Sequence, residues 1–290
     1  EEWFDGLTKE GHTLRFHTDA AISKEELLEG ARSADALCTM VNDPVDSEVI
    51  LTNPELKIIS NYAVGFNNID LKAATSRKLP VTNTPDVLTD ATAEHAVALL
   101  LALVRKVVAA DGFTRSGKFT EWSPTLFLGS QLRGKTLGIV GMGRIGKRVA
   151  EILVQGFGMR VLYSGRKAVS GCTEPEYCFT PLDRLLKESD VVSLHCPLTP
   201  ETQHLLTREK LLLLKKEAYL VNTARGPVVD EGALVEILKV GRIAGAALDV
   251  FEDEPRLHSG LAGCENVVLT PHVGSGTHEA RKLMANMVSK

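Results

Sequence analysis

The chain has 290 residues, of which 44% are apolar and 24% are charged, and its formal net charge is −4. This length predicts two domains. The slightly negative net charge gives no electrostatic reason to expect nucleic acid, so we expect no nucleic-acid partner. The longest apolar run, 96–104, is far shorter than the roughly 20 residues that cross a bilayer, so we expect no membrane partner either.

The five cysteines, at positions 38, 172, 178, 196 and 264, are irregularly spaced and form no C-x-x-C pair. Reduced thiols in a cytoplasmic protein are the state that this pattern favours. The spacing also gives no reason to expect a metal site, and none of the five cysteines stands in a motif typical of a catalytic nucleophile.

The first part of the chain has the pattern of a small α/β unit. Short apolar runs predict strands over Thr13–His17, Ala36–Met40, Lys57–Ser60 and Val81–Thr82. A long apolar helix is predicted from about Asp90 to Ala110. This helix separates the small unit from the next part of the chain.

From residue 136 onward, strands alternate with helices. Six strands are predicted, at Thr136–Val140, Arg160–Tyr163, Asp190–Ser193, Ala218–Asn222, Ile243–Asp249 and Val267–Leu269. Helices such as Glu231–Val240 fill most of the gaps, and a last helix is predicted within Ser275–Lys290. Such alternation predicts an α/β fold with a mostly parallel, doubly wound sheet. Ligands of such folds bind beyond the carboxyl ends of the strands, so we expect the site in a cleft between the two domains.

The most informative motif is a glycine loop that joins the first of these strands to a helix. In it, Gly141 allows a tight turn, Gly143 lets the backbone approach a pyrophosphate, and Gly146 lets the helix pack closely on the strand. Arg144 and Ile145 begin the helix, whose free N–H groups and positive dipole end attract an anion. Strand and helix contexts are both present, as the motif requires, so the loop predicts dinucleotide binding.

The end of the next strand indicates which dinucleotide is bound. An NAD-binding fold usually carries an acid about 20 residues past the loop, on the adenosine ribose hydroxyls. Here Ser164 stands near that place, and Arg166 and Lys167 follow it. A hydroxyl and two cations can bind a ribose 2′-phosphate that a carboxylate would repel, which predicts NADP(H). Alternatively, Arg166 and Lys167 are solvated loop charges.

Three polar residues follow three of the later strands. They are Arg225, Glu254 and His272. A guanidinium can polarise a carbonyl and hold a carboxylate, an imidazolium can protonate a developing alkoxide, and a carboxylate beside the imidazole fixes its ring and raises its pKa. Each residue alone also fits an ordinary role in a turn or on the surface. Together they predict the reduction of a carbonyl group.

With these motifs in view, nearly the whole chain resembles the D-isomer-specific 2-hydroxyacid dehydrogenases. The resemblance is carried by Gly141–Gly146, His195–Thr199, Val221–Gly226, Ala247–Phe251 with Glu254–Pro255, and Pro271–Gly274. It implies a Rossmann cofactor domain over 85–270 and a smaller flavodoxin-like substrate domain over 1–84 and 271–290. The family's usual first strand has no counterpart before Glu1, and its last helix stops short at Lys290.

The same resemblance implies roles for individual residues. Arg225, Glu254 and His272 would be catalytic, and the backbone N–H groups near Val64 and Gly65 would hold the substrate carboxylate. Asp249 would hold the nicotinamide carboxamide. Further cofactor contacts are expected at Cys196, Pro197, Thr223 and Gly274. His95, on the long helix, is expected to pack or make a local hydrogen bond rather than to act in catalysis.

Within the family, the likeness is greatest to the glyoxylate/hydroxypyruvate reductases. It is carried by Thr84–Glu94, Gly117–Trp122 and Tyr163–Arg166. This likeness implies a homodimer formed through the helix region 90–110, with Trp122 reaching the substrate pocket of the partner subunit. The expected reaction is the reduction of small 2-oxo acids with NADPH. Oxidation of 3-phosphoglycerate, reduction of 2-ketogluconate, and a dinucleotide-sensing transcriptional corepressor remain as alternatives.

Overall fold

The computed structural model describes residues 2–17, 22–171 and 177–290. The chain divides into two compact units: a small unit of residues 1–88 with 276–290, and a large unit of residues 89–275. The domain boundaries expected from the sequence, at 84/85 and 270/271, lie within a few residues of these divisions. Among the described residues, no helix is both long enough and apolar enough to cross a bilayer.

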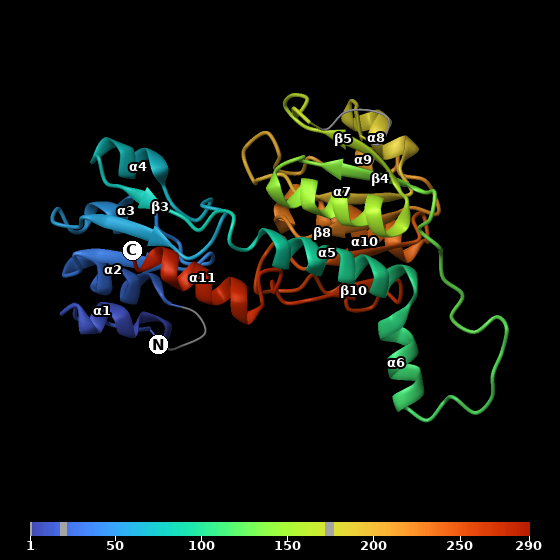
Figure 1. Cartoon of the computed structure of the whole chain (residues 1–290), viewed down its shortest axis with the longest axis horizontal. Coiled ribbons are helices and arrows are strands. Elements are labelled where there is room, and N and C mark those ends of the chain that lie inside the picture. Colours follow the sequence, from blue (N-terminus) through green and yellow to red (C-terminus); the bar gives the residue numbers. More distant parts are fainter. Residues whose placement is uncertain (1, 18–21, 172–176) are drawn as a thin grey trace. The chain divides into compact units, whose positions relative to one another are not determined.

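The small unit is a three-stranded parallel sheet with helices around it (Figure 1). Its strands are β1 (Ala36–Thr39), β2 (Ile58–Asn61) and β3 (Val81–Thr82), in that order; its helices are η1 (Glu2–Phe4), α1 (Asp5–Lys9), α2 (Lys24–Arg32), α3 (Ser47–Leu51), α4 (Leu71–Ser76) and α11 (His278–Val288). Apolar side chains of α2, α3, β2 and α4 form its core. The last helix, α11, belongs to this unit, because the Tyr62 hydroxyl donates to the Arg281 carbonyl at 2.6 Å.

The strand predicted at Thr13–His17 is wrong. In the described part of the chain this segment pairs with no strand, and it has no regular secondary structure. Leu14 and Phe16 alternate with polar residues as in a strand. However, the Phe16 ring is 45% exposed and rests beside the ring of Phe4 instead of in the core. The alternation of apolar and polar residues predicted a strand, but a strand also needs a neighbouring strand to hydrogen-bond its N–H and C=O groups.

The large unit is a seven-stranded sheet in which every neighbouring pair is parallel. Its strands are β4 (Thr136–Val140), β5 (Arg160–Ser164), β6 (Tyr177–Phe179), β7 (Val191–Leu194), β8 (Tyr219–Asn222), β9 (Gly245–Leu248) and β10 (Val267–Leu269), and their order is β10-β9-β8-β7-β4-β5-β6. The order reverses between β4 and β7, the crevice where such sheets bind ligands. The six predicted strands are present, and the short edge strand β6 is additional.

Helices cover both faces of this sheet, as Figure 1 shows. One face packs against α5 (Thr89–Val104) and α7 (Arg144–Phe157). The other packs against α8 (Leu182–Glu188), α9 (Arg208–Leu211) and α10 (Glu231–Lys239). Strand β4 is buried along its whole length, as expected for a parallel strand covered on both sides. The predicted α/β, doubly wound fold is confirmed.

The single long helix predicted from Asp90 to Ala110 is wrong, because it is two helices. After α5, Lys106 adopts a left-handed conformation with φ of 54°, and α6 (Val107–Arg115) then begins. The Val104 carbonyl accepts the Ser130 N–H at 2.9 Å, which takes the place of a bond within the helix. Gly129 lies so close to that carbonyl that a Cβ on it would be 2.2 Å away. A distant segment thus ends the helix, which its apolar sequence could not indicate.

Candidate active site

The glycine loop at the end of β4 has the geometry that a dinucleotide requires. Gly141 has φ of 97°, and a Cβ there would lie 2.7 Å from the Cys196 nitrogen. A Cβ on Gly146 would lie 2.4 Å from the Gly141 carbonyl oxygen, so the helix can approach the strand only at a glycine. Around Gly143, by contrast, the space is open for 4 Å, and this residue begins α7 with no side-chain cap. Open space in front of an uncapped helix N-terminus is suited to a phosphate.

The first turn of α7 contains Arg144 and Ile145, as predicted. Beside it, Ser164 ends β5, is nearly buried, and accepts the Gly141 N–H through its carbonyl at 2.9 Å. Arg166 and Lys167 lie in the exposed loop that follows. The structure therefore brings the Ser164 backbone next to the glycine loop and leaves the two cations facing solvent.

On the other side of the glycine loop lies the segment after β7. Cys196 is buried, and burial raises the pKa of its thiol to about 11, so the thiol stays protonated near neutral pH. Pro197 is exposed. The His195 ring bonds Ser193 Oγ at 2.8 Å, and burial lowers the pKa of His195 to about 4, so its imidazole is neutral. This segment supports the loop and offers no nucleophile.

Thr223, just after β8, has a side-chain hydroxyl that no described residue hydrogen-bonds, although the hydroxyl is buried. Buried hydroxyls are nearly always bonded, so an unpaired one beside a ligand crevice points to a ligand group. The open space at Gly143 and the unpaired Thr223 hydroxyl together fit the predicted dinucleotide.

Arg225 stands at the start of the turn η2 (Gly226–Val228), in extended backbone. The turn is held by Asn222, whose side chain donates to the Arg225 carbonyl at 2.9 Å and accepts the Ala224 N–H at 3.0 Å. Burial lowers the pKa of the guanidinium, and the Glu254 carboxylate opposes that shift. The group remains charged, because arginine does not lose its proton in proteins.

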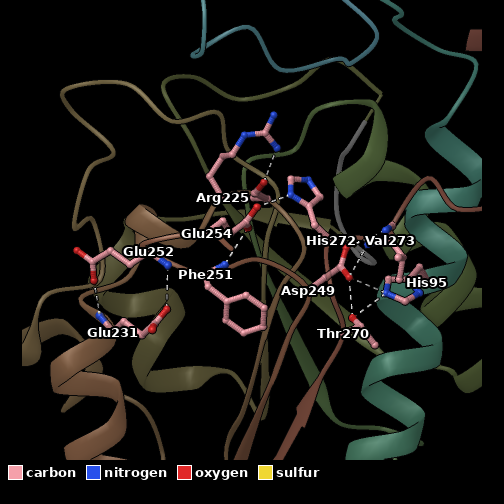
Figure 2. A network of polar contacts seen from close by, with 12 residues as sticks. His95, Arg225, Glu231, Asp249, Phe251, Glu252, Glu254, Thr270, His272 and Val273 are labelled. Carbon is pink, nitrogen blue, oxygen red and sulfur yellow. Dashed lines mark hydrogen bonds and ion pairs between the residues drawn. The ribbon is translucent and has the colours of Figure 1, made fainter. Parts of the chain in front are cut away.

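Glu254 and His272 form a hydrogen-bonded pair beside Arg225 (Figure 2). His272 Nδ1 lies 2.8 Å from Glu254 Oε2, and the Phe251 N–H donates to Glu254 Oε1 at 2.9 Å. Burial alone would raise the pKa of the Glu254 carboxyl, but the bonds from His272 and Phe251 and the charge of Arg225 bring it below its usual value. The structure therefore brings the three predicted catalytic residues together. Both side chains of the pair stay 30% exposed, so a substrate can reach them.

His272 itself has a left-handed backbone, with φ of 55°, and its N–H donates to the Asp249 carbonyl at 2.8 Å. Non-glycine residues rarely adopt this region, and such strain is concentrated at functional sites. The conformation aims the ring at Glu254.

Asp249 is the centre of a second polar cluster near this site, also drawn in Figure 2. Its side chain is 1% exposed, and Oδ1 accepts from His95 Nε2 at 3.2 Å, the Thr270 hydroxyl at 2.6 Å and the Val273 N–H at 2.9 Å. Oδ2 accepts the Gly274 N–H at 2.8 Å. Burial would raise the pKa of Asp249, but these donors outweigh it and lower the pKa. The sequence predicted core packing or a local hydrogen bond for His95; it makes a hydrogen bond, but the partner Asp249 is 154 residues away in the chain, so the bond is not local.

In the small unit, the predicted substrate loop follows β2. Its carbonyls are tied down, because Asn83 donates to the Val64 oxygen and Asn61 donates to the Gly65 oxygen, both at 2.8 Å. The N–H groups of Val64 and Gly65 donate to no acceptor within the described chain. Two adjacent, unpaired amides on a fixed loop are a suitable site for a carboxylate.

Trp122, the other predicted substrate residue, lies elsewhere in the large unit. Its side chain is 78% exposed and lines a hollow of about 280 Å³ with Phe113, Phe119 and Phe127. Within the large unit, Figure 1 shows that α6 and the segment after it, which contains Trp122, stand away from the sheet. Neither Arg225 nor His272 lines this hollow.

Comparison with known proteins now gives this geometry a context. The family model described as "D-isomer specific 2-hydroxyacid dehydrogenase, NAD binding domain" matches residues 97–274. The glyoxylate reductase of Thermococcus litoralis is 53% identical over 91% of this chain and 81% of its own length. The chain belongs to the D-isomer specific 2-hydroxyacid dehydrogenases. The resemblance recognised from the motifs is thereby confirmed.

Solved structures agree with this family membership. A crystal structure of a Thermus thermophilus protein, 45% identical, superposes with a TM-score of 0.93 over 100% of this chain and 91% of that one. The NADPH-dependent glyoxylate/hydroxypyruvate reductase of Sinorhizobium meliloti, in complex with NADP and malonate, is 33% identical to the present chain. The superposition has a TM-score of 0.81 and covers 93% of the present chain and 82% of the reductase chain.

Several supporting residues of this dehydrogenase were missed from the sequence. Asn61 and Asn222 end strands β2 and β8 and hold the loops that follow, and Thr270 completes the Asp249 cluster. Asparagine at the carboxyl end of a predicted strand is a signal that could have indicated the first two, because its side chain bonds nearby backbone. No pattern in the sequence links Thr270 to His95.

Proposed function

We propose that this protein reduces small 2-oxo acids, glyoxylate and hydroxypyruvate first, with NADPH. The observation that supports the proposal best is the His272–Glu254 pair beside Arg225, at the carboxyl ends of strands in a dinucleotide-binding sheet. Two relatives described above carry the names glyoxylate reductase and glyoxylate/hydroxypyruvate reductase. When bound, the nicotinamide would supply the hydride.

Each catalytic residue has a proposed task. His272 protonates the carbonyl oxygen, and Glu254 holds the Nδ1 side of the ring so that Nε2 can deliver the proton. Arg225 polarises the carbonyl and stabilises charge developing on the oxygen. In the reverse direction, His272 takes the proton from the hydroxyl.

The substrate carboxylate is proposed to bind the N–H groups of Val64 and Gly65. A phosphate on the third carbon would need further cations, and the loop 63–69 contains none. This argues against 3-phosphoglycerate as the substrate. A corepressor would need no turnover, so an activity assay separates that alternative.

For the cofactor, NADPH is favoured by Ser164 at the end of β5, with Arg166 and Lys167 after it. The hydroxyl would donate to the ribose 2′-phosphate, and the two cations, which face solvent, could close over it. The first turn of α7, with Arg144 and Ile145, would receive the pyrophosphate.

The remaining cofactor contacts are proposed for residues around the same crevice. Cys196 and Pro197 would line the adenosine side, and Thr223 would bond the cofactor with its unpaired hydroxyl. Asp249 and Gly274 would face the nicotinamide. Its carboxamide would be held by Asp249 Oδ2, since that oxygen accepts one hydrogen bond from the described residues where Oδ1 accepts three.

A homodimer through the α5–α6 region is also proposed. Apolar side chains remain exposed there, with Val108 58% and Trp122 78% exposed, and a hollow of about 810 Å³ lies along Leu101 and Ala102. Exposed apolar surface of this kind marks interaction sites. Sedimentation equilibrium of the purified protein checks the proposal, and a monomer at micromolar concentration would contradict it.

A substrate panel tests the activity itself. Purified protein is assayed with NADPH and with NADH against glyoxylate, hydroxypyruvate, pyruvate, 2-ketogluconate and 3-phosphohydroxypyruvate. We expect the highest kcat/KM for glyoxylate or hydroxypyruvate with NADPH. A highest value for 2-ketogluconate or 3-phosphohydroxypyruvate would refute the substrate proposal, and no turnover at all would refute the enzyme.

A further inference from the structure

His204 is the starting point, because it touches two loops of the proposed active site without belonging to either. It precedes α9 and has a left-handed backbone, with φ of 47°. Its N–H donates to the Pro227 carbonyl at 2.7 Å, and its ring Nε2 lies 2.5 Å from Glu252 Oε1. One residue thus bonds both the turn after Arg225 and the loop before Glu254.

The backbone contact of His204 continues along the chain. The Leu206 N–H donates to the Val228 carbonyl at 3.0 Å, and the Asp230 N–H donates to the Leu206 carbonyl at 3.1 Å. Leu206 and Val229 form a parallel bridge. The segment that begins at His204 therefore runs beside the turn η2 and anchors it.

Glu252, which the His204 ring contacts, also makes two hydrogen bonds with Glu231. Glu252 Oε2 accepts the Glu231 N–H at 3.2 Å, and the Glu252 N–H donates to Glu231 Oε2 at 2.9 Å. This reciprocal pair, drawn in Figure 2, binds the loop after β9 to the start of α10. His204 supplies the partner for the remaining carboxylate oxygen of Glu252.

The two loops also touch directly. A Cβ on Gly226 would lie 1.9 Å from the Phe251 carbonyl and 2.4 Å from the Glu252 nitrogen. Gly226 follows Arg225 immediately, and Phe251 donates the N–H that holds Glu254. A shift of either loop would therefore move the guanidinium relative to the Glu254–His272 pair.

We propose that His204 is a positioning residue for the reduction: it holds the turn of Arg225 and the loop of Glu254 in register, with its backbone on Pro227 and its ring on Glu252. It touches neither of the proposed reacting groups. The proposal rests on the proposed function for the catalytic roles of Arg225 and Glu254.

The test compares His204→Leu with His204→Gln. Both side chains are unbranched at Cβ, so they share the backbone cost of the left-handed conformation, but only Gln can place a donor on Glu252. His12→Leu, at an exposed histidine, is the control for the loss of an imidazole. For each protein we measure kcat and KM for glyoxylate at saturating NADPH, the Kd for NADPH, and amide hydrogen exchange over 250–256.

We expect His204→Leu to lower kcat by roughly 10- to 100-fold, the scale set by a misplaced catalytic group, with the Kd for NADPH within about twofold of wild type. His204→Gln should recover kcat to within about threefold, and His12→Leu should match wild type. Loss of one charge-assisted bond should speed exchange over 250–256 by about tenfold in the Leu variant alone.

Wild-type kcat in His204→Leu would overturn the proposal. So would an equal loss in the Gln variant, or a loss that comes with weaker NADPH binding and faster exchange throughout the protein, because those results indicate general destabilisation. If the wild type itself reduces no 2-oxo acid, the proposed function fails. Amide hydrogen exchange over 250–256 then still tests the positioning role of His204. Unchanged exchange in His204→Leu rejects that role, and faster exchange in His204→Leu that is absent in His204→Gln supports it.

Discussion

Asp249 and Glu254 are two carboxylates on the same loop after β9, and their surroundings differ sharply. Asp249 is 1% exposed and accepts from two side chains and two backbone N–H groups. Glu254 is 30% exposed and accepts from His272 and one backbone N–H. The first is nearly saturated by the protein, whereas the second remains open to a ligand. Asp249 therefore mainly holds the structure, with only Oδ2 left for the proposed carboxamide contact, whereas Glu254 is open for chemistry on the substrate.

The histidine partners of the two carboxylates repeat the contrast. His95 bonds a carboxylate oxygen that it shares with Thr270. His272 bonds Glu254 through Nδ1 from a strained backbone. We therefore expect substitutions at the open pair to change activity, and those in the saturated cluster to change stability.

The largest effect is expected at His272. His272→Ala removes the proposed acid, so kcat should fall by about 10² to 10⁴-fold while NADPH binding is kept. Steady-state kinetics and fluorescence titration with NADPH measure the two quantities. Retention of more than about a tenth of wild-type kcat would show that the open pair is not the proton donor.

A matched pair of amide substitutions tests the other half of the contrast. In Asp249→Asn, the buried amide NH₂, itself a donor, would face N–H groups that now donate to a carboxylate oxygen. The free energy of unfolding should therefore fall by about 3 kcal/mol. In Glu254→Gln it should change by less than about 1 kcal/mol, because the group is partly exposed. Urea denaturation of both variants provides the comparison. Equal losses would break the distinction between saturated and open carboxylates.

His195 extends the test to pH. Its folded pKa of about 4 lies below the usual 6.5, so the fold favours the neutral ring. The resulting stability is complete above pH 6.5 and is lost as pH falls towards 4. Between pH 7.5 and 4.5, the free energy of unfolding should fall by about 2 to 3 kcal/mol more in wild type than in His195→Gln. Parallel pH dependence of the two proteins would mean that His195 is not buried as a neutral ring.

Ser164 is expected to give the smallest effect, at the open edge of the cofactor site. Ser164→Asp should repel a ribose 2′-phosphate and shift the ratio of kcat/KM for NADPH over NADH by about 10- to 100-fold towards NADH. Ser164→Ala, which removes the hydroxyl without adding charge, serves as the control. An unchanged ratio in the Asp variant would place the 2′-phosphate, if NADPH binds, away from β5.

Much of the large unit could be predicted because its signals are local. Strands such as β4 are buried on both faces and are mostly apolar. The glycine loop requires its spacing for steric reasons that the structure shows at Gly141 and Gly146. The errors occurred where distant segments decide. Ser130 ends α5 at Val104, and Thr13–His17 has no partner strand in the described chain. Neither fact is encoded within the segment that was misread.

The site follows the same rule. Arg225, Glu254 and His272 were found because each follows a strand, and parallel strands bring their ends to one edge. The supporting contacts of His204 and Glu252 join segments 48 residues apart in the chain. Hydrophobic periodicity carries no information about such a bond, so only the fold reveals it.

The position of α11 has a consequence for biosynthesis. Residues 1–88 leave the ribosome before the large unit, but helix α11, which packs in the same small unit, begins only after the 187 residues of the large unit, 89–275, have been made. At about 5 to 20 residues per second, this interval lasts roughly 10 to 40 seconds. During that time the later-made unit can fold while the earlier one waits for its last helix. Until α11 is made, the Tyr62 hydroxyl lacks the Arg281 carbonyl to which it donates in the folded unit.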